Sequence, residues 1–130
     1  MSALRASLLV FLGAGLGANA RFWLGTCVAK LWGQAFPWGT LLINVSGSLL
    51  IGLIFGLYAR QEIEPGWRYL LITGLLGGYT TFSAFSWETL KLIQEGKPGA
   101  ALAYVAASVV VGLAACWAGF EAGKTMGGRG

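Results

Sequence analysis

The sequence predicts an all-α membrane protein, a single domain of four transmembrane helices that spans residues 1–130. Apolar residues make up 56% of the chain and charged residues 11%, whereas an average soluble domain is roughly 25% charged. So few charges cannot cover a soluble surface, and disordered chains have the opposite composition. Four long, nearly charge-free runs alternate with short charged links, and a spanning helix needs ~20 mostly apolar residues.

The four spans are expected at about residues 4–32, 38–59, 69–95 and 98–121. Proline residues fall at the ends of these segments, where a missing backbone N–H is tolerated. The stretch that ends in Ala18-Asn19-Ala20 also resembles a signal peptide with its cleavage site. Apolar sequence resumes at Phe22, so we favour a retained first helix.

The distribution of basic residues leaves the orientation open. With four spans, both termini and the link at residues 60–68 share one side of the membrane. That side carries five basic residues and the other carries three: Arg5, Arg60, Arg68, Lys124 and Arg129 against Lys30, Lys91 and Lys97. Since Lys/Arg bias sets orientation, so weak a bias permits either one orientation with cytoplasmic termini or dual topology, in which two copies pack antiparallel.

Small residues recur at four-residue spacing along the predicted helices. The pairs and triplets are Gly13 with Gly17, Ser48 with Gly52 and Gly56, and Ser108 with Gly112. Such faces let helix backbones approach closely in lipid. We expect them to serve packing both inside one subunit and between subunits. Four short helices barely enclose a cavity, so a homodimer at least is predicted.

The third span contains the most unusual run, in which three glycines occur within five residues, at Gly74, Gly77 and Gly78. Each glycine costs roughly 1 kcal/mol of helix propensity relative to alanine. We therefore expect the third helix to break mid-membrane, between about Gly77 and Thr80. Carbonyls freed there must line a cavity or meet a partner, and a cation could bind them. The alternative is a glycine-rich helix crossing.

Beyond the expected break, Phe82 and Phe85 lie three residues apart and share a helix face, and Ser83 and Ser86 share the adjoining face. A phenylalanine stripe usually packs in a core. The positive edge of an aromatic ring can nevertheless contact an anion, and neighbouring hydroxyls can donate to it. These residues are therefore candidates for a narrow lane for a small anion.

Further polar residues lie inside the predicted spans. Asn44 and Ser48 are one turn apart in the second span, as are Tyr104 and Ser108 in the fourth. Buried polar groups in membranes mark pathways or form interhelical hydrogen bonds, and both readings stay open.

Two charges stand out. Arg21 lies within the first span, where arginine costs ~2.5–3.5 kcal/mol on insertion scales. It either attracts anions to a vestibule or holds the fold by binding carbonyls. Glu88 either lies at a mouth or is an ordinary interfacial charge.

The run Gly77-Gly78-Tyr79-Thr80-Thr81-Phe82-Ser83-Ala84-Phe85-Ser86 resembles the signature G-G-x-T-T-F-S-T-F-S of the Fluc (CrcB-type) fluoride channels. The run from Gly39 to Asn44 is similar to the G-T-x-x-x-N motif of that family, and Arg21 is similar to its first-helix arginine. The resemblance covers essentially the whole chain. Ala84 departs from the pattern, since threonine is common at that position.

The resemblance implies a dual-topology antiparallel homodimer in the cytoplasmic (inner) membrane, with two pores that passively export toxic fluoride and reject chloride. It also implies a structural, untransported Na⁺ at the dimer centre, bound by the carbonyls of Gly77 and Thr80 from both subunits. The pore residues that it implies are Phe82, Phe85, Asn44, Ser83, Ser108 and, less closely matched, Tyr104. Glu88 matches the family as loosely as Tyr104 does. The expected partners are fluoride, a second copy and the bilayer, without nucleic acid.

Three other functions fit the sequence less well. A proton-coupled exporter of the small multidrug resistance type needs a membrane-buried carboxylate, and the charge-free runs contain none; Glu88 lies just past the third. A non-transporting assembly factor would use the glycines and phenylalanines for packing alone. An enzyme is not predicted, because no nucleophile–base pair or metal cluster is visible and histidine is absent.

Overall fold

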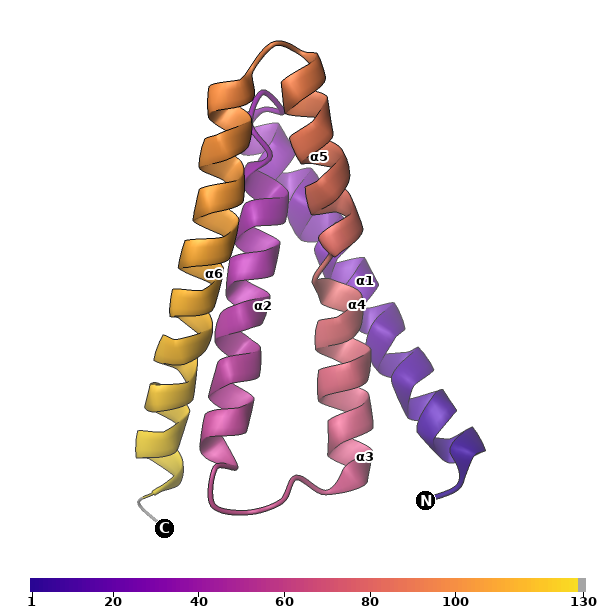
Figure 1. Cartoon of the computed structure of the whole chain (residues 1–130). Helices are drawn as coiled ribbons and strands as arrows, with labels where there is room; N and C mark the ends of the chain where they lie inside the picture. Colours follow the sequence, from indigo (N-terminus) through magenta and orange to yellow (C-terminus); the bar gives the residue numbers. More distant parts are fainter. Residues whose placement is uncertain (129–130) are drawn as a thin grey trace.

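The computed structural model of the chain describes residues 1–128, and within that range all regular structure is helical (Figure 1). The elements in order are α1 (Ala3–Trp32), α2 (Trp38–Leu57), α3 (Pro65–Trp67), η1 (Arg68–Leu76), α4 (Gly77–Tyr79), α5 (Phe82–Gln94) and α6 (Pro98–Gly127).

Local sequence signals explain where the long helices begin and end. The side chain of Ser2 caps α1 by accepting from the backbone N–H of Arg5. α1 ends at Gly33, which has a φ of 76°, a conformation that only glycine adopts without strain. Pro37 precedes α2 and Pro98 begins α6.

The chain crosses the molecule four times. The start of α1, the end of α6 and the link between α2 and α3 lie at one end, and the α1–α2 and α5–α6 links lie at the other (Figure 1). The four nearly charge-free runs of the sequence predict the same distribution of termini and links between the two sides of the membrane. Arg129, which we counted with the first side, lies outside the described residues.

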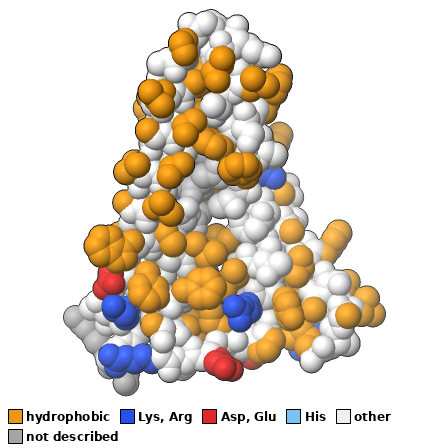
Figure 2. All heavy atoms as spheres, viewed as in Figure 1, with side chains coloured by type: hydrophobic (Ala, Val, Ile, Leu, Met, Phe, Trp, Pro, Cys, Tyr) orange, Lys and Arg blue, Asp and Glu red, His pale blue; other side chains and the backbone are white. Residues whose placement is uncertain are grey.

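Three helices are long and apolar enough to cross a membrane: α1, α2 and α6. The third run is divided among η1, α4 and α5, and none of these pieces reaches spanning length. Apolar side chains are spread over the whole visible face, and most visible charges lie near the end that carries the termini (Figure 2). Only a few apolar side chains are buried within the chain, so lipid or a partner must cover the rest.

Glycine determines how the helices pack. α2 and α6 lie side by side (Figure 1), and a Cβ added at Gly52 or Gly56 would overlap the backbone of α6. Gly13 and Gly17 face the backbone of η1 in the same way. The predicted small-residue faces therefore do pack helices within one subunit.

The third segment changes conformation twice. η1 is wound as a π-helix over nine residues, a form that is rare at this length and is often found at functional sites. α4 then carries Gly77 and Gly78, which remain helical. Thr80 and Thr81 are extended, with ψ angles of 156° and 116°, and α5 resumes at Phe82. The non-helical residues thus begin at Thr80, just past the glycines, and we call Thr80–Thr81 the interruption.

Candidate functional site

A pocket of about 450 Å³ lies beside the interruption, between α2, α6 and the third segment. We call it the inner pocket. It is lined by six of the predicted site residues: Asn44, Gly77, Thr80, Phe82, Phe85 and Ser108. Ser48 and Thr81 contribute further hydroxyl groups to the wall. The structure therefore brings together residues that lie up to 64 positions apart in the sequence.

Asn44 on α2 pairs with the backbone of the interruption. Its Nδ2 donates to the carbonyl of Thr81 at 3.0 Å, and its Oδ1 accepts from the N–H of Thr81 at 2.8 Å. The Thr81 hydroxyl in turn accepts from the N–H of Ala84 and caps α5. The Asn44 amide therefore replaces the hydrogen bonds that a helix would give to Thr81. Without it, the N–H and the carbonyl of Thr81 would be unpaired.

Ser108 on α6 lines the inner pocket. Its Oγ is buried and has no hydrogen-bond partner among the described residues. A buried hydroxyl without a partner costs free energy, so this atom favours a ligand that can accept a hydrogen bond.

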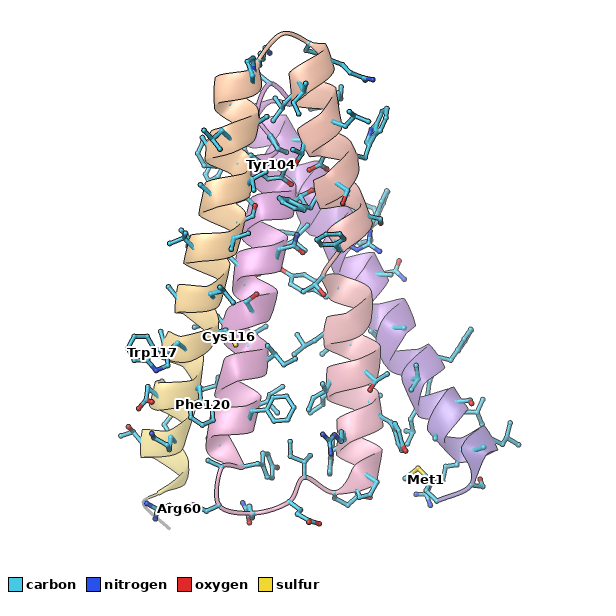
Figure 3. All side chains as sticks on the ribbon, viewed as in Figure 1. Met1, Arg60, Tyr104, Cys116, Trp117 and Phe120 are labelled. Atoms are coloured by element: carbon cyan, nitrogen blue, oxygen red, sulfur yellow. The ribbon has the colours of Figure 1, made fainter. Side chains whose placement is uncertain are left out.

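Two phenylalanine rings complete the inner pocket. The ring centroids of Phe82 and Phe85 are 5.6 Å apart with an interplanar angle of 48°. Phe82 is 79% exposed in the single chain, whereas Phe85 packs its ring 5.2 Å from that of Tyr104. Tyr104 points from α6 into the space between α2 and α5 (Figure 3) and has no exposed surface.

A second pocket of about 460 Å³, the outer pocket, opens between α1, α2 and α5. It contains the two charges singled out in the sequence, Arg21 and Glu88. Glu88 accepts from the hydroxyls of Thr40 at 2.7 Å and Tyr104 at 2.8 Å, one at each carboxylate oxygen. Thr81 lines both pockets, so they approach one another at the interruption.

Arg21 makes the carbonyl contact that is one of the two roles left open by the sequence. Its Nε donates to the carbonyl of Gly78 at 3.2 Å, which ties α1 to α4. The same residue lines the outer pocket, where its charge can attract an anion.

Two predicted pore residues lie outside the inner pocket. Ser83 is exposed, and its hydroxyl lies 3.3 Å from that of Thr81. Tyr104 reaches the inner pocket only through its contact with Phe85. Sequence reasoning assigned no role to Thr40, Ser46 or Tyr79, although each forms a side-chain hydrogen bond in this region. Their partners lie on other helices, and nothing in the local sequence predicts them.

The donor set at the interruption fits the Na⁺ that the resemblance implies. Within residues 1–128, no hydrogen bond reaches the carbonyl oxygen of Gly77 or Thr80, because the N–H of Thr81 bonds to Asn44 and the N–H of Ala84 bonds to the Thr81 hydroxyl. Hard cations prefer such oxygen ligands, and Na⁺ binds unwound backbone in other membrane proteins. The described residues contain no group of three or more His, Cys, Asp or Glu side chains that could hold a metal.

The sequence of the chain matches a known protein family. The family model described as "CrcB-like protein, Camphor Resistance (CrcB)" matches residues 8–120. The chain belongs to the CrcB family. The resemblance found in the residues is thereby confirmed, and CrcB membership makes the chain a transport protein rather than an enzyme, as predicted.

Curated relatives match over most of their length. A protein of Solibacter usitatus is 48% identical over 113 residues, which cover 86% of this chain and 93% of the relative. A protein of Nitrobacter hamburgensis is 49% identical over 115 residues, with 88% and 91% covered. One of Acidobacterium capsulatum is 44% identical over 120 residues, with 92% and 96% covered. These CrcB relatives are named fluoride-specific ion channels.

Proposed function

We propose that the protein is a fluoride-selective channel that passively exports fluoride across the cytoplasmic membrane. The observation that carries this proposal is the unpartnered hydroxyl of Ser108, buried in a pocket with Asn44 and the rings of Phe82 and Phe85. The names of the CrcB relatives agree with it. Hydroxyl, amide and ring-edge donors suit a small anion, and they hold it less tightly than a lysine would.

The route that we propose passes from the outer to the inner pocket. Fluoride reaches the outer pocket, drawn by Arg21, and passes Thr81, which lines both pockets. In the inner pocket it exchanges water for the hydroxyl of Ser108 and the ring edges of Phe82 and Phe85. Fluoride is hard to dehydrate, so weak donors must act in turn, and a narrow lane with such donors discriminates against chloride.

The functional unit that we propose is a dual-topology antiparallel homodimer with two pores, in which the third segment spans the membrane with its interruption near the middle. The exposed ring of Phe82 and the largely apolar surface of the single chain support a partner (Figure 2). A pathway residue that is 79% exposed needs a second wall. The weak charge bias permits opposite orientations of the two copies.

A structural Na⁺ belongs to the same proposal. The carbonyls of Gly77 and Thr80, which lack hydrogen-bond donors within residues 1–128, would hold it together with those of the second copy. When bound, the ion supplies positive charge near the fluoride route and compensates backbone groups that lipid cannot.

A single variant tests the pore assignment. We expect Phe82→Ile to reduce fluoride release from liposomes about tenfold or more, because it removes the ring edge while retaining an apolar side chain of similar length. Release is followed with a fluoride electrode. Phe11→Ile is the matched control, since Phe11 is a similarly exposed ring on α1. Equal release by wild type and Phe82→Ile would remove Phe82 from the pore.

A further inference from the structure

Three side chains from neighbouring helices hold the end of α4 and the interruption. Arg21 on α1 binds the carbonyl of Gly78, and Asn44 on α2 binds the backbone of Thr81. Between them, the phenol of Tyr79 lies 2.8 Å from the hydroxyl of Ser46 on α2. Residues 78, 79 and 81 are therefore each fixed to another helix.

The direction of the Tyr79–Ser46 hydrogen bond follows from the donors present. The hydroxyl of Ser46 donates to the carbonyl of Ile43 at 3.1 Å, one turn earlier in α2. A serine hydroxyl has a single hydrogen, so while it donates to Ile43 its oxygen accepts from Tyr79. The phenol therefore donates to Ser46, and a phenylalanine ring could not replace it.

The ring of Tyr79 is also fixed by packing. A Cβ added at Gly47 would meet the Thr80 methyl group and lie 3.4 Å from the Tyr79 ring. Gly47 is buried, so its missing side chain leaves the space that these two groups occupy. Tyr79 is thus held at two points, with its ring on the backbone of α2 and its hydroxyl on Ser46.

Tyr79 is well placed to orient the free carbonyls. It is the last residue of α4 and precedes Thr80 directly, and Gly77 begins the same short helix. Because Tyr79 lies two residues after Gly77 and directly before Thr80, a shift of its backbone would turn the Thr80 carbonyl and, through the same turn, the Gly77 carbonyl.

We propose that Tyr79 and Ser46 are a positioning pair that aligns the carbonyls of Gly77 and Thr80 for cation binding. This inference rests on the proposed function in one respect, because it assumes that a structural Na⁺ binds between two copies of the chain. It assigns a role to Tyr79, which occupies the position that the motif leaves undefined.

The experiment measures how much Na⁺ the purified full-length protein needs. The thermal midpoint is followed as Na⁺ replaces a large organic cation at constant ionic strength, for wild type, Tyr79→Phe, Ser46→Ala and the double variant. We expect each single variant to raise the half-maximal Na⁺ concentration about three- to tenfold, as the loss of one interhelical hydrogen bond allows. The double variant should match the single variants, because both remove the same bond.

The controls separate positioning from a general loss of stability. Tyr58→Phe removes a phenol that forms no side-chain hydrogen bond within residues 1–128, and its half-maximal Na⁺ should equal that of wild type. A merely structural role of Tyr79 would lower the midpoint equally at every Na⁺ concentration. Unchanged half-maximal Na⁺ in Tyr79→Phe, or additive effects in the double variant, would overturn the inference.

Fluoride release from liposomes is measured in parallel. This measurement tests the proposed function, and its outcome does not depend on the Na⁺ titration. A wild-type protein with a Na⁺-dependent midpoint and no fluoride release would contradict the proposed function, and the variants would still decide the inference. A wild-type midpoint that is insensitive to Na⁺ would overturn the inference even where fluoride is released.

Discussion

Two contacts of α2 differ in kind. Along its last turns α2 packs on α6 through glycines, with backbone against backbone at Gly52 and Gly56. About two turns before Gly52, the same helix meets the third segment through polar side chains, at Asn44 and Ser46. The first contact uses shape alone, whereas the second uses directional hydrogen bonds to an irregular backbone.

The difference teaches how one short helix supports both the fold and the site. Close glycine contacts maximise van der Waals packing, which drives helix association in lipid. Irregular backbone inside a membrane must instead be satisfied by neighbouring groups, and α2 provides them. Substitutions in the glycine contact should therefore affect folding, and those in the polar contact should affect ion passage.

The largest effect is expected in the glycine contact. Gly52→Val places a branched side chain against the backbone carbonyl of Cys116, which cannot move without shifting α6. Overpacking costs ~1–3 kcal/mol and sometimes more, so we expect little monodisperse protein in detergent by size-exclusion chromatography. Gly99→Val is the control, because no atom lies within 4 Å of a Cβ at Gly99. Normal recovery of Gly52→Val would refute the close contact between α2 and α6.

The next effect is expected in the polar contact. Asn44→Leu leaves the N–H and carbonyl of Thr81 without partners, at ~1–3 kcal/mol for each unpaired group. We expect folded protein with fluoride release reduced about tenfold or more, measured in liposomes with a fluoride electrode. The control is Asn19→Leu, since the amide of Asn19 bonds only the carbonyl of Gly15 in its own helix. Wild-type release by Asn44→Leu would show that the interruption does not depend on this amide.

A smaller effect is expected at Ser108. Ser108→Ala removes the unpartnered hydroxyl but little volume, so we expect a two- to fivefold loss of fluoride release, of the size of about one neutral hydrogen bond. The thermal midpoint should stay the same or rise, because the hydroxyl has no partner to lose in residues 1–128. Ser7→Ala is the control at an exposed position on α1. A fall in the midpoint without any change in release would assign Ser108 to packing.

The sequence predicts the long helices well and the contacts of the third segment poorly. Pro37, Pro98 and the charge-free runs predict the starts of α2 and α6, because helix boundaries depend on local chemistry. Three glycines indicate an irregular third segment, but the non-helical residues are Thr80 and Thr81, because Asn44 binds the backbone there. That bond joins residues 37 positions apart, and such contacts leave no local signal.

The candidate site shows the same limit. Phe82, Phe85, Asn44 and Ser108, which the resemblance implies for the pore, all line one pocket. The resemblance does not predict that Glu88 binds Thr40 and Tyr104, or that Tyr79 binds Ser46. These pairs depend on how α2, α5 and α6 converge, which only the packed helices define.

The most direct test of the central claim is simultaneous recording of fluoride and chloride release from liposomes that contain the purified wild-type protein, with the proton gradient collapsed. We predict fast fluoride release, no chloride release above protein-free liposomes, and no dependence on a proton gradient. Equal release of both anions, or fluoride release that requires a proton gradient, would contradict a passive fluoride-selective channel.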